Sequence, residues 1–189
     1  DWRRWEIADQ RFADGRPDVL SYVRAPLDHD LTVTGEVAAD LFASTSGTDA
    51  DFIVKLIDVY PENATPNAWT AEEGPKPGQY AQSVNGYELP VAMEVRRGRY
   101  NTSYEHPKAL VANAPVEWKI PLRDRDYVFL KGHRLMVQVQ STWFPLIDRN
   151  PQTFVPSIYK ATAADFRKAT QRVYSSAALP SHVVLPVVP

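Results

Sequence analysis

Three segments of this chain sort their side chains into two faces at a period of two, and this pattern restricts them to extended structure. In segment 31–44 apolar residues fall on one side and polar residues such as Thr34 and Glu36 on the other, which is typical of a strand with one solvated face. Segment 133–142 alternates in the same way. Segment 51–60 is nearly apolar on both sides, which predicts a central strand that is covered above and below.

Shorter stretches of the same kind, joined by turn-rich connections, complete the pattern. The further candidate strands are 18–23, 92–97, 116–122, 127–130 and 183–188. Several short strands favour a two-sheet sandwich over a βαβ sheet. At 189 residues the chain is long enough for one domain with a substantial core. We therefore predict an all-β fold, a jelly-roll β-sandwich.

Two segments depart from the strand pattern. Segment 162–174 predicts one short helix, because Thr162 stands three residues before Asp165 as in a capping box, and apolar residues then share one helical face. Segment 61–90 holds five of the 16 prolines and three of the 8 glycines. A long irregular loop of this kind is usually functional or docks onto another surface.

Charge and composition exclude several classes of protein. With 21 basic and 23 acidic residues the net charge is −2, so we expect no nucleic-acid partner. No apolar run approaches the roughly 20 residues of a membrane helix, so we expect no membrane partner. The absence of cysteine excludes disulfides, thiol nucleophiles and thiolate metal sites.

Three aspartates surround the apolar segment 51–60 and are the first candidates for chemistry. Asp49 and Asp51 lie on one side of an extended chain and could converge on a cation, but calcium takes six to eight oxygens. The alternative is a turn whose Ser, Thr and Asp side chains bond nearby backbone N–H groups. Asp58 lies within the strand and needs a partner, most simply an arginine or a backbone donor. The structural interpretation is favoured for all three, and no metal or other cofactor is expected.

The histidines and serines show no catalytic pattern. His29 lies in a turn-like sequence and His106 in a polar loop, while His133 and His182 each begin a strand, where an imidazole commonly bonds the backbone. There is no HExxH spacing, no GxSxG nucleophile turn and no glycine-rich phosphate loop. We expect no catalytic residue within this chain.

Aromatic residues are the remaining candidates for a binding surface. Trp143 and Phe144 directly follow a strand, and neighbouring residues of an extended chain point to opposite faces, so one can enter the core while the other faces outward. Trp69 and Tyr80 lie in the long loop 61–90. Core packing and a role in a cleft or interface both stay open for Trp143 and Phe144.

The chain also resembles a known family. The segments TDADFIVKLIDVYP (48–61), FLKGHRLMVQVQSTWFPLIDRNPQ (129–152) and PSHVVLPVV (180–188) are similar to the C-terminal β domain of a set of bacterial α/β-hydrolases. That set includes cocaine esterase, X-Pro dipeptidyl-peptidase, glutaryl-cephalosporin acylase-like proteins and α-amino-acid ester hydrolases. NGYELPVAMEVRRGRY (85–100) looks closest to the last two groups.

The resemblance implies a galactose-binding-like jelly roll that packs on an upstream serine α/β-hydrolase domain and a helical cap. The catalytic Ser–Asp–His triad of the family would lie upstream of Asp1, in an enzyme that hydrolyses small esters or amides. The β domain would then help to shape the cleft, with Trp143, Phe144, Trp69 and Tyr80 as our candidate contacts, and it would contribute to assembly, including a possible homo-oligomer.

We expect residues 1–15 to connect to the hydrolase domain and residues 16–189 to form the β-sandwich. For the compartment we expect the bacterial periplasm or secretion, with the cytoplasm as the alternative. The alternative functions are a carbohydrate-binding module, which would present Trp69, Trp118 or Trp143 to sugars, and a protein-assembly module.

Overall fold

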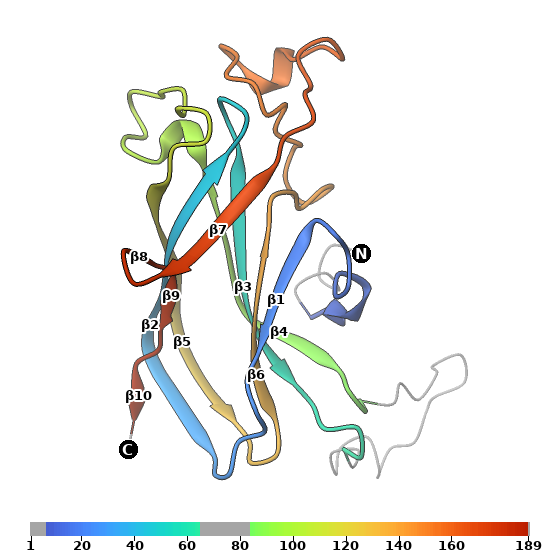
Figure 1. Ribbon diagram of the computed structural model, residues 1–189. Coiled ribbons are helices and arrows are strands. Elements are labelled where there is room, and N and C mark those ends of the chain that lie inside the picture. The colour runs from blue at the N-terminus through green and yellow to red at the C-terminus, as the bar shows by residue number, and fades with distance from the viewer. Residues whose placement is uncertain (1–6, 65–83, 189) are drawn as a thin grey trace, which may run out of the picture.

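The computed structural model describes residues 7–64 and 84–188, which form two packed antiparallel sheets (Figure 1). The four-stranded sheet has the order β1-β6-β3-β4. The six-stranded sheet is built on β2, which pairs with β5, β7, β9 and β10, while β8 pairs with β7. The strands are β1 Val19–Val23, β2 Leu31–Thr45, β3 Asp51–Val59, β4 Glu88–Arg97, β5 Val116–Phe129, β6 Arg134–Gln140, β7 Gln171–Ser176, β8 Leu179–Pro180, β9 His182–Val184 and β10 Val187–Val188. The predicted all-β sandwich is confirmed.

The core lies between the inner faces of the two sheets. Phe52 of β3 and Trp118 of β5 are both buried, and their rings meet edge to face with centroids 4.7 Å apart. Val54 and Leu56 extend the same face of β3. Burial of each such side chain contributes about 1.5–3 kcal/mol, which makes the contact between the sheets the main source of stability.

Strand β3 is buried on its outer face as well. Ile53, Lys55 and Ile57 point away from the core, and all three are at most 1% exposed. Figure 1 shows the N-terminal segment, with the 3-10 helix η2 (Gln10–Phe12), on this side of the four-stranded sheet. A hydrogen bond from Lys55 Nζ to Gln10 Oε1 fixes the segment there. The prediction of a central strand covered above and below is therefore confirmed.

The predicted helix over 162–174 is wrong. Thr162 does bond Asp165 through its backbone N–H and its hydroxyl, but these bonds close only one turn. The chain then extends, and Gln171–Ser176 becomes β7, with Val173 opposite Ala43 of β2. Pairing with the edge of β2 satisfies the backbone groups and buries Val173 against the core, which outweighs a weak local preference for helix. The only helices in the described ranges are the 3-10 turns η2, η3 (Gly98–Tyr100) and η4 (Ile158–Lys160).

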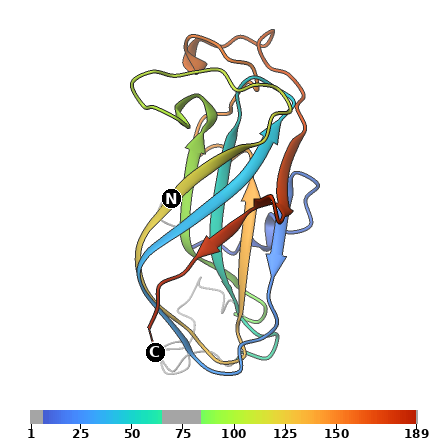
Figure 2. The same ribbon diagram turned by 60° about the vertical axis from the view of Figure 1, so that its left-hand side comes forward.

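Other strand boundaries also differ from the prediction. Segments 116–122 and 127–130 form one strand, β5, interrupted by a bulge at which Arg123 has φ +69°. Segment 183–188 divides into β9 and β10, which lie along β2 (Figure 2). The predicted loop 61–90 ends early because β4 begins at Glu88. Trp69 and Tyr80 lie outside the described residues. Among the described residues no helix has the length and apolar character needed to cross a membrane.

Candidate functional site

The aspartates at the start of β3 hold the fold together. Asp49 is fully buried and accepts hydrogen bonds from the backbone N–H of Ala50 and from Nε of Arg99 at 2.9 Å. Asp51 accepts from Asn150 Nδ2 at 2.9 Å and lies 3.8 Å from Arg97 Nε. Because the two carboxylates bind different arginines, they do not converge on a cation.

Burial has the largest effect on the pKa of Asp51. Loss of solvent raises the pKa of its carboxyl to about 6, against the opposing effect of Arg97. Within residues 7–64 and 84–188 no three His, Cys, Asp or Glu side chains are grouped so that they could hold a metal ion.

Asp58 lies at the other end of β3 and links the two sheets. Its carboxylate accepts from the hydroxyl of Tyr127 on β5 at 2.8 Å and from Nδ1 of His133 at 2.9 Å. An arginine or backbone partner was the wrong prediction for Asp58, and a backbone partner was wrong for His133. His182 does bond a backbone carbonyl, that of Pro180, at 2.8 Å.

The Asp58–His133 pair is not part of a nucleophilic relay. The second partner of Asp58 is a tyrosine, and in the described part of the chain no serine hydroxyl is bonded to a histidine ring nitrogen. The carboxylate, imidazole and phenol are all used to join β3, β5 and the turn that precedes β6. Asp58, Tyr127 and His133 therefore have a structural role.

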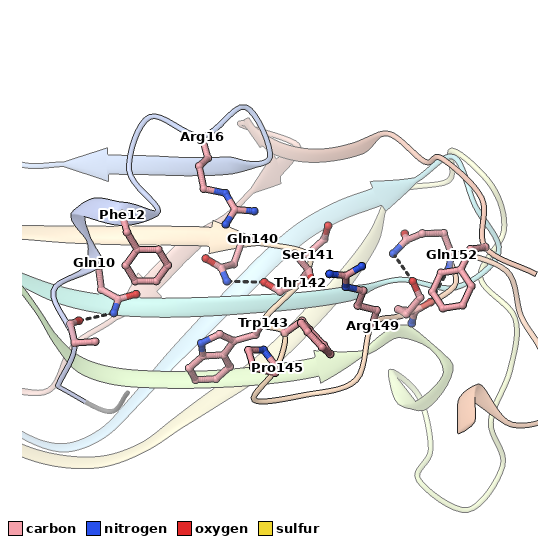
Figure 3. A pocket seen from close by; sticks show the side chains of 14 residues that line it. Gln10, Phe12, Arg16, Gln140, Ser141, Thr142, Trp143, Pro145, Arg149 and Gln152 are labelled. Carbon is pink, nitrogen blue, oxygen red and sulfur yellow. Dashed lines mark hydrogen bonds between the residues drawn. The ribbon is translucent and has the colours of Figure 1, made fainter. Parts of the chain in front are cut away.

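A pocket of about 640 Å³ opens between the N-terminal segment and the loop after β6 (Figure 3). This volume is typical of small-ligand sites. The aromatic side chains that line it are Phe12, Trp143, Phe144 and Phe166. Trp143 is half-buried, whereas Phe144 is 56% exposed. The structure therefore brings Trp143 and Phe144 together on the wall of one pocket, and their role in a cleft or interface stays a prediction.

The pocket carries positive charge. Arg16 and Arg149 line it, and no described lining residue is an aspartate or glutamate. Figure 3 shows Arg16 reaching from the N-terminal segment toward Gln140. Lys55 does not itself line the pocket, but its Nζ donates a hydrogen bond to the lining residue Gln10 and lies 5.6 Å from the ring centroid of Trp143 and 5.9 Å from that of Phe12. Burial, and then the nearby Arg16, lowers the pKa of Lys55 to about 8.

Sequence reasoning did not single out Lys55, Gln10 or Arg16 as site residues. The sequence did contain one indication of Lys55, because it is the only charged residue in the otherwise apolar segment 52–57. Gln10 and Arg16 could not have been assigned, since their place depends on how the N-terminal segment folds back onto the sheet. Trp118, proposed above as a possible sugar-binding residue, is fully buried and cannot contact a glycan.

Comparison with known proteins gives concordant results. A model of the X-Pro dipeptidyl-peptidase C-terminal non-catalytic domain matches residues 6–184. Cocaine esterase of Rhodococcus sp. (strain MB1 Bresler) is 34% identical over 181 residues, which cover 96% of this chain and 27% of that protein.

Two solved structures are also similar over the whole chain. One is an α-amino acid ester hydrolase labelled with selenomethionine, with a TM-score of 0.88, 48% identity and coverage of 99% of this chain and 28% of that one. The other is an aminopeptidase from the marine sediment archaeon Thaumarchaeota archaeon, with a TM-score of 0.88, 42% identity and coverage of 100% and 28%. The chain thus spans little more than a quarter of the length of these relatives.

Proposed function

This chain belongs to the family of X-Pro dipeptidyl-peptidase C-terminal non-catalytic domains, and from that premise we propose that it serves a longer serine α/β-hydrolase acting on small esters or amides. The family match over residues 6–184 is the observation that carries the proposal. The names of the relatives, an esterase, an ester hydrolase and an aminopeptidase, agree with it. The chain also spans only 27–28% of those proteins, which leaves room for a catalytic domain elsewhere.

In the proposed enzyme the bond-breaking groups lie outside this chain. A serine would form the acyl-enzyme, a histidine would move the proton, and an aspartate would orient the imidazole. The β-sandwich would pack on the domain that holds them and form part of the wall of its cleft. Residues 1–15 would join the two domains, and the parent protein would self-associate as a homo-oligomer.

The mouth of the pocket is the surface that we assign to this packing. Phe144, 56% exposed, and Phe166, 43% exposed, line the pocket, and Leu146, 47% exposed, follows two residues after Phe144 in the same loop. Apolar side chains gathered at one edge of a pocket are typical of a surface that another part of a protein covers. Trp143, set deeper, would give the contact a rigid floor.

The test compares the intact polypeptide with the 189-residue chain. We expect the intact polypeptide to cleave a p-nitrophenyl ester and to be labelled by a fluorophosphonate, and the chain alone to do neither. Serine-dependent turnover by the chain itself would overturn the proposal.

A second experiment tests the packing surface. Phe144→Ser in the intact polypeptide should lower kcat/KM for the ester about tenfold, since misplacement of a cleft wall by about 1 Å can cost up to 100-fold. Tyr159→Ser is the matched control, because Tyr159 is 81% exposed and does not line the pocket. Equal activity of both variants and the parent would remove Phe144 from the packing surface.

A further inference from the structure

A row of three polar residues crosses the outer face of the four-stranded sheet. Ser21 of β1 is directly opposite Gln138 of β6, and Gln138 is directly opposite Lys55 of β3. Side chains of directly opposed residues lie on the same face of a sheet, with Cβ atoms about 4.5–5.5 Å apart. Ser21, Gln138 and Lys55, here called the polar row, therefore lie side by side beneath the N-terminal segment.

The polar row has more hydrogen-bonding capacity than the described residues use. The ammonium group of Lys55 carries three donors, and its one described acceptor is Gln10 Oε1, at 2.6 Å. Neither the Ser21 hydroxyl nor the Gln138 side-chain amide has a partner among the described residues. Gln138 is fully buried and Lys55 is 1% exposed. Buried polar groups are nearly always paired in folded proteins, so these groups indicate a missing polar partner.

The charges around the polar row indicate that the missing partner is an anion. Arg16 is already bound by Asp18 through two hydrogen bonds, of 2.9 and 2.5 Å. Neither Lys55 nor Arg149 has an ion-pair partner in the described ranges, and Arg149 instead stacks on Phe144 with Cζ 4.6 Å from the ring centroid. A buried cation without a counter-charge is costly, and an anion at this point would offset that cost.

The walls of the pocket specify the rest of the ligand. Trp143 and Phe12 both lie within 6 Å of Lys55 Nζ, and both line the pocket. We propose that the pocket binds an aromatic carboxylate, with its carboxylate group on Lys55 and its ring against Trp143. The carboxylate, a stronger acceptor than an amide oxygen, displaces Gln10 Oε1 from Lys55.

The experiment titrates phenylacetate into the intact polypeptide and into the 189-residue chain, by calorimetry at pH 7. We expect saturable binding with phenylacetate at least tenfold tighter than phenylacetamide, its neutral counterpart. Lys55→Met keeps the unbranched stem and removes the charge, so it should weaken binding at least tenfold. Lys119→Met is the matched control, since the Lys119 side chain is 71% exposed on the opposite sheet, and it should leave binding unchanged.

Comparison of the two forms identifies the source of the carboxylate. Binding to both forms indicates a free ligand, whereas binding to the short chain alone indicates that a carboxylate of the longer polypeptide fills the site. A crystal structure of the intact polypeptide, soaked with 4-bromophenylacetate, provides a second measurement if the short chain does not fold. The proposal is overturned if Lys55→Met and the parent bind phenylacetate equally. It is equally overturned if neither form binds it and the soaked crystal has no carboxylate within hydrogen-bonding distance of Lys55 Nζ.

Discussion

Replacement of Asp58 by alanine tests whether the polar link between the sheets stabilises the fold. Asp58 is 1% exposed, and its carboxylate is the acceptor for Tyr127 on the facing sheet and for His133 in the turn just before β6. An ionised carboxylate only accepts hydrogen bonds, so Nδ1 of His133 carries the hydrogen. Asp58→Ala removes both bonds at once and leaves two donors in a largely buried space.

The magnitude follows from opposing effects. Each buried donor left without an acceptor costs about 1–3 kcal/mol. Burial raises the pKa of the Asp58 carboxyl, so keeping this group ionised in the folded protein costs free energy. The alanine variant does not bear that cost, which partly offsets the loss of the two hydrogen bonds. The net expectation is a loss of about 2–4 kcal/mol in the free energy of unfolding at pH 7.

The measurement is urea unfolding of the 189-residue chain, followed by circular dichroism. Tyr127→Phe alone should cost about 1–2 kcal/mol, and the double variant should show a coupling energy of about 1 kcal/mol between the two residues. A loss below about 0.5 kcal/mol for Asp58→Ala would mean that water replaces the carboxylate, and that the sheets are held together by apolar packing alone.

Two further predictions concern pH. Burial, with repulsion from Asp14 and Asp9, raises the pKa of Glu88 to about 7, so ionisation of this group makes the fold less stable as the pH rises from about 4.5 to 7. Glu88→Gln should therefore gain about 1–3 kcal/mol at pH 8 in urea melts, and no gain over the exposed control Glu117→Gln would contradict it. For Lys55 the sign is reversed: its pKa of about 8 lies below that of the unfolded chain, so the unfolded state binds more protons and stability rises between about pH 8 and 10.5. The stability of the parent relative to Lys55→Met should rise by about 1–3 kcal/mol across that window, and a constant difference would place the ammonium in solvent.

The architecture could be predicted because the long strands show their own pattern of apolar and polar residues in the sequence. The burial of β3 on both faces was readable from its composition, and so was the alternation of β2. The prediction of a helix over 162–174 was wrong because the conformation of this segment depends on pairing with the free edge of β2. No local sequence pattern reveals that pairing. The hydrogen bonds between Thr162 and Asp165 form in a single turn as well as at the start of a helix.

The candidate site was only partly predictable. Trp143 and Phe144 were accessible to sequence reasoning because they follow a strand directly. The groups that give the pocket its charge come from segments more than 100 residues apart, Arg16 and Arg149, and meet only through the fold. The unpaired state of Gln138 is likewise a property of its neighbours on β1 and β3, not of its own sequence context.

The dependence of the larger sheet on β2 has a consequence for biosynthesis. β2 is synthesised well before β9 and β10, so one part of its length acquires partners only when His182–Val184 and Val187–Val188 are made. Until then Val33 and Ala38 lie along an open edge, and such edges recruit strands from other chains. Nascent or C-terminally clipped molecules should therefore aggregate, and soluble yield should depend on the last eight residues far more than their small buried surface suggests.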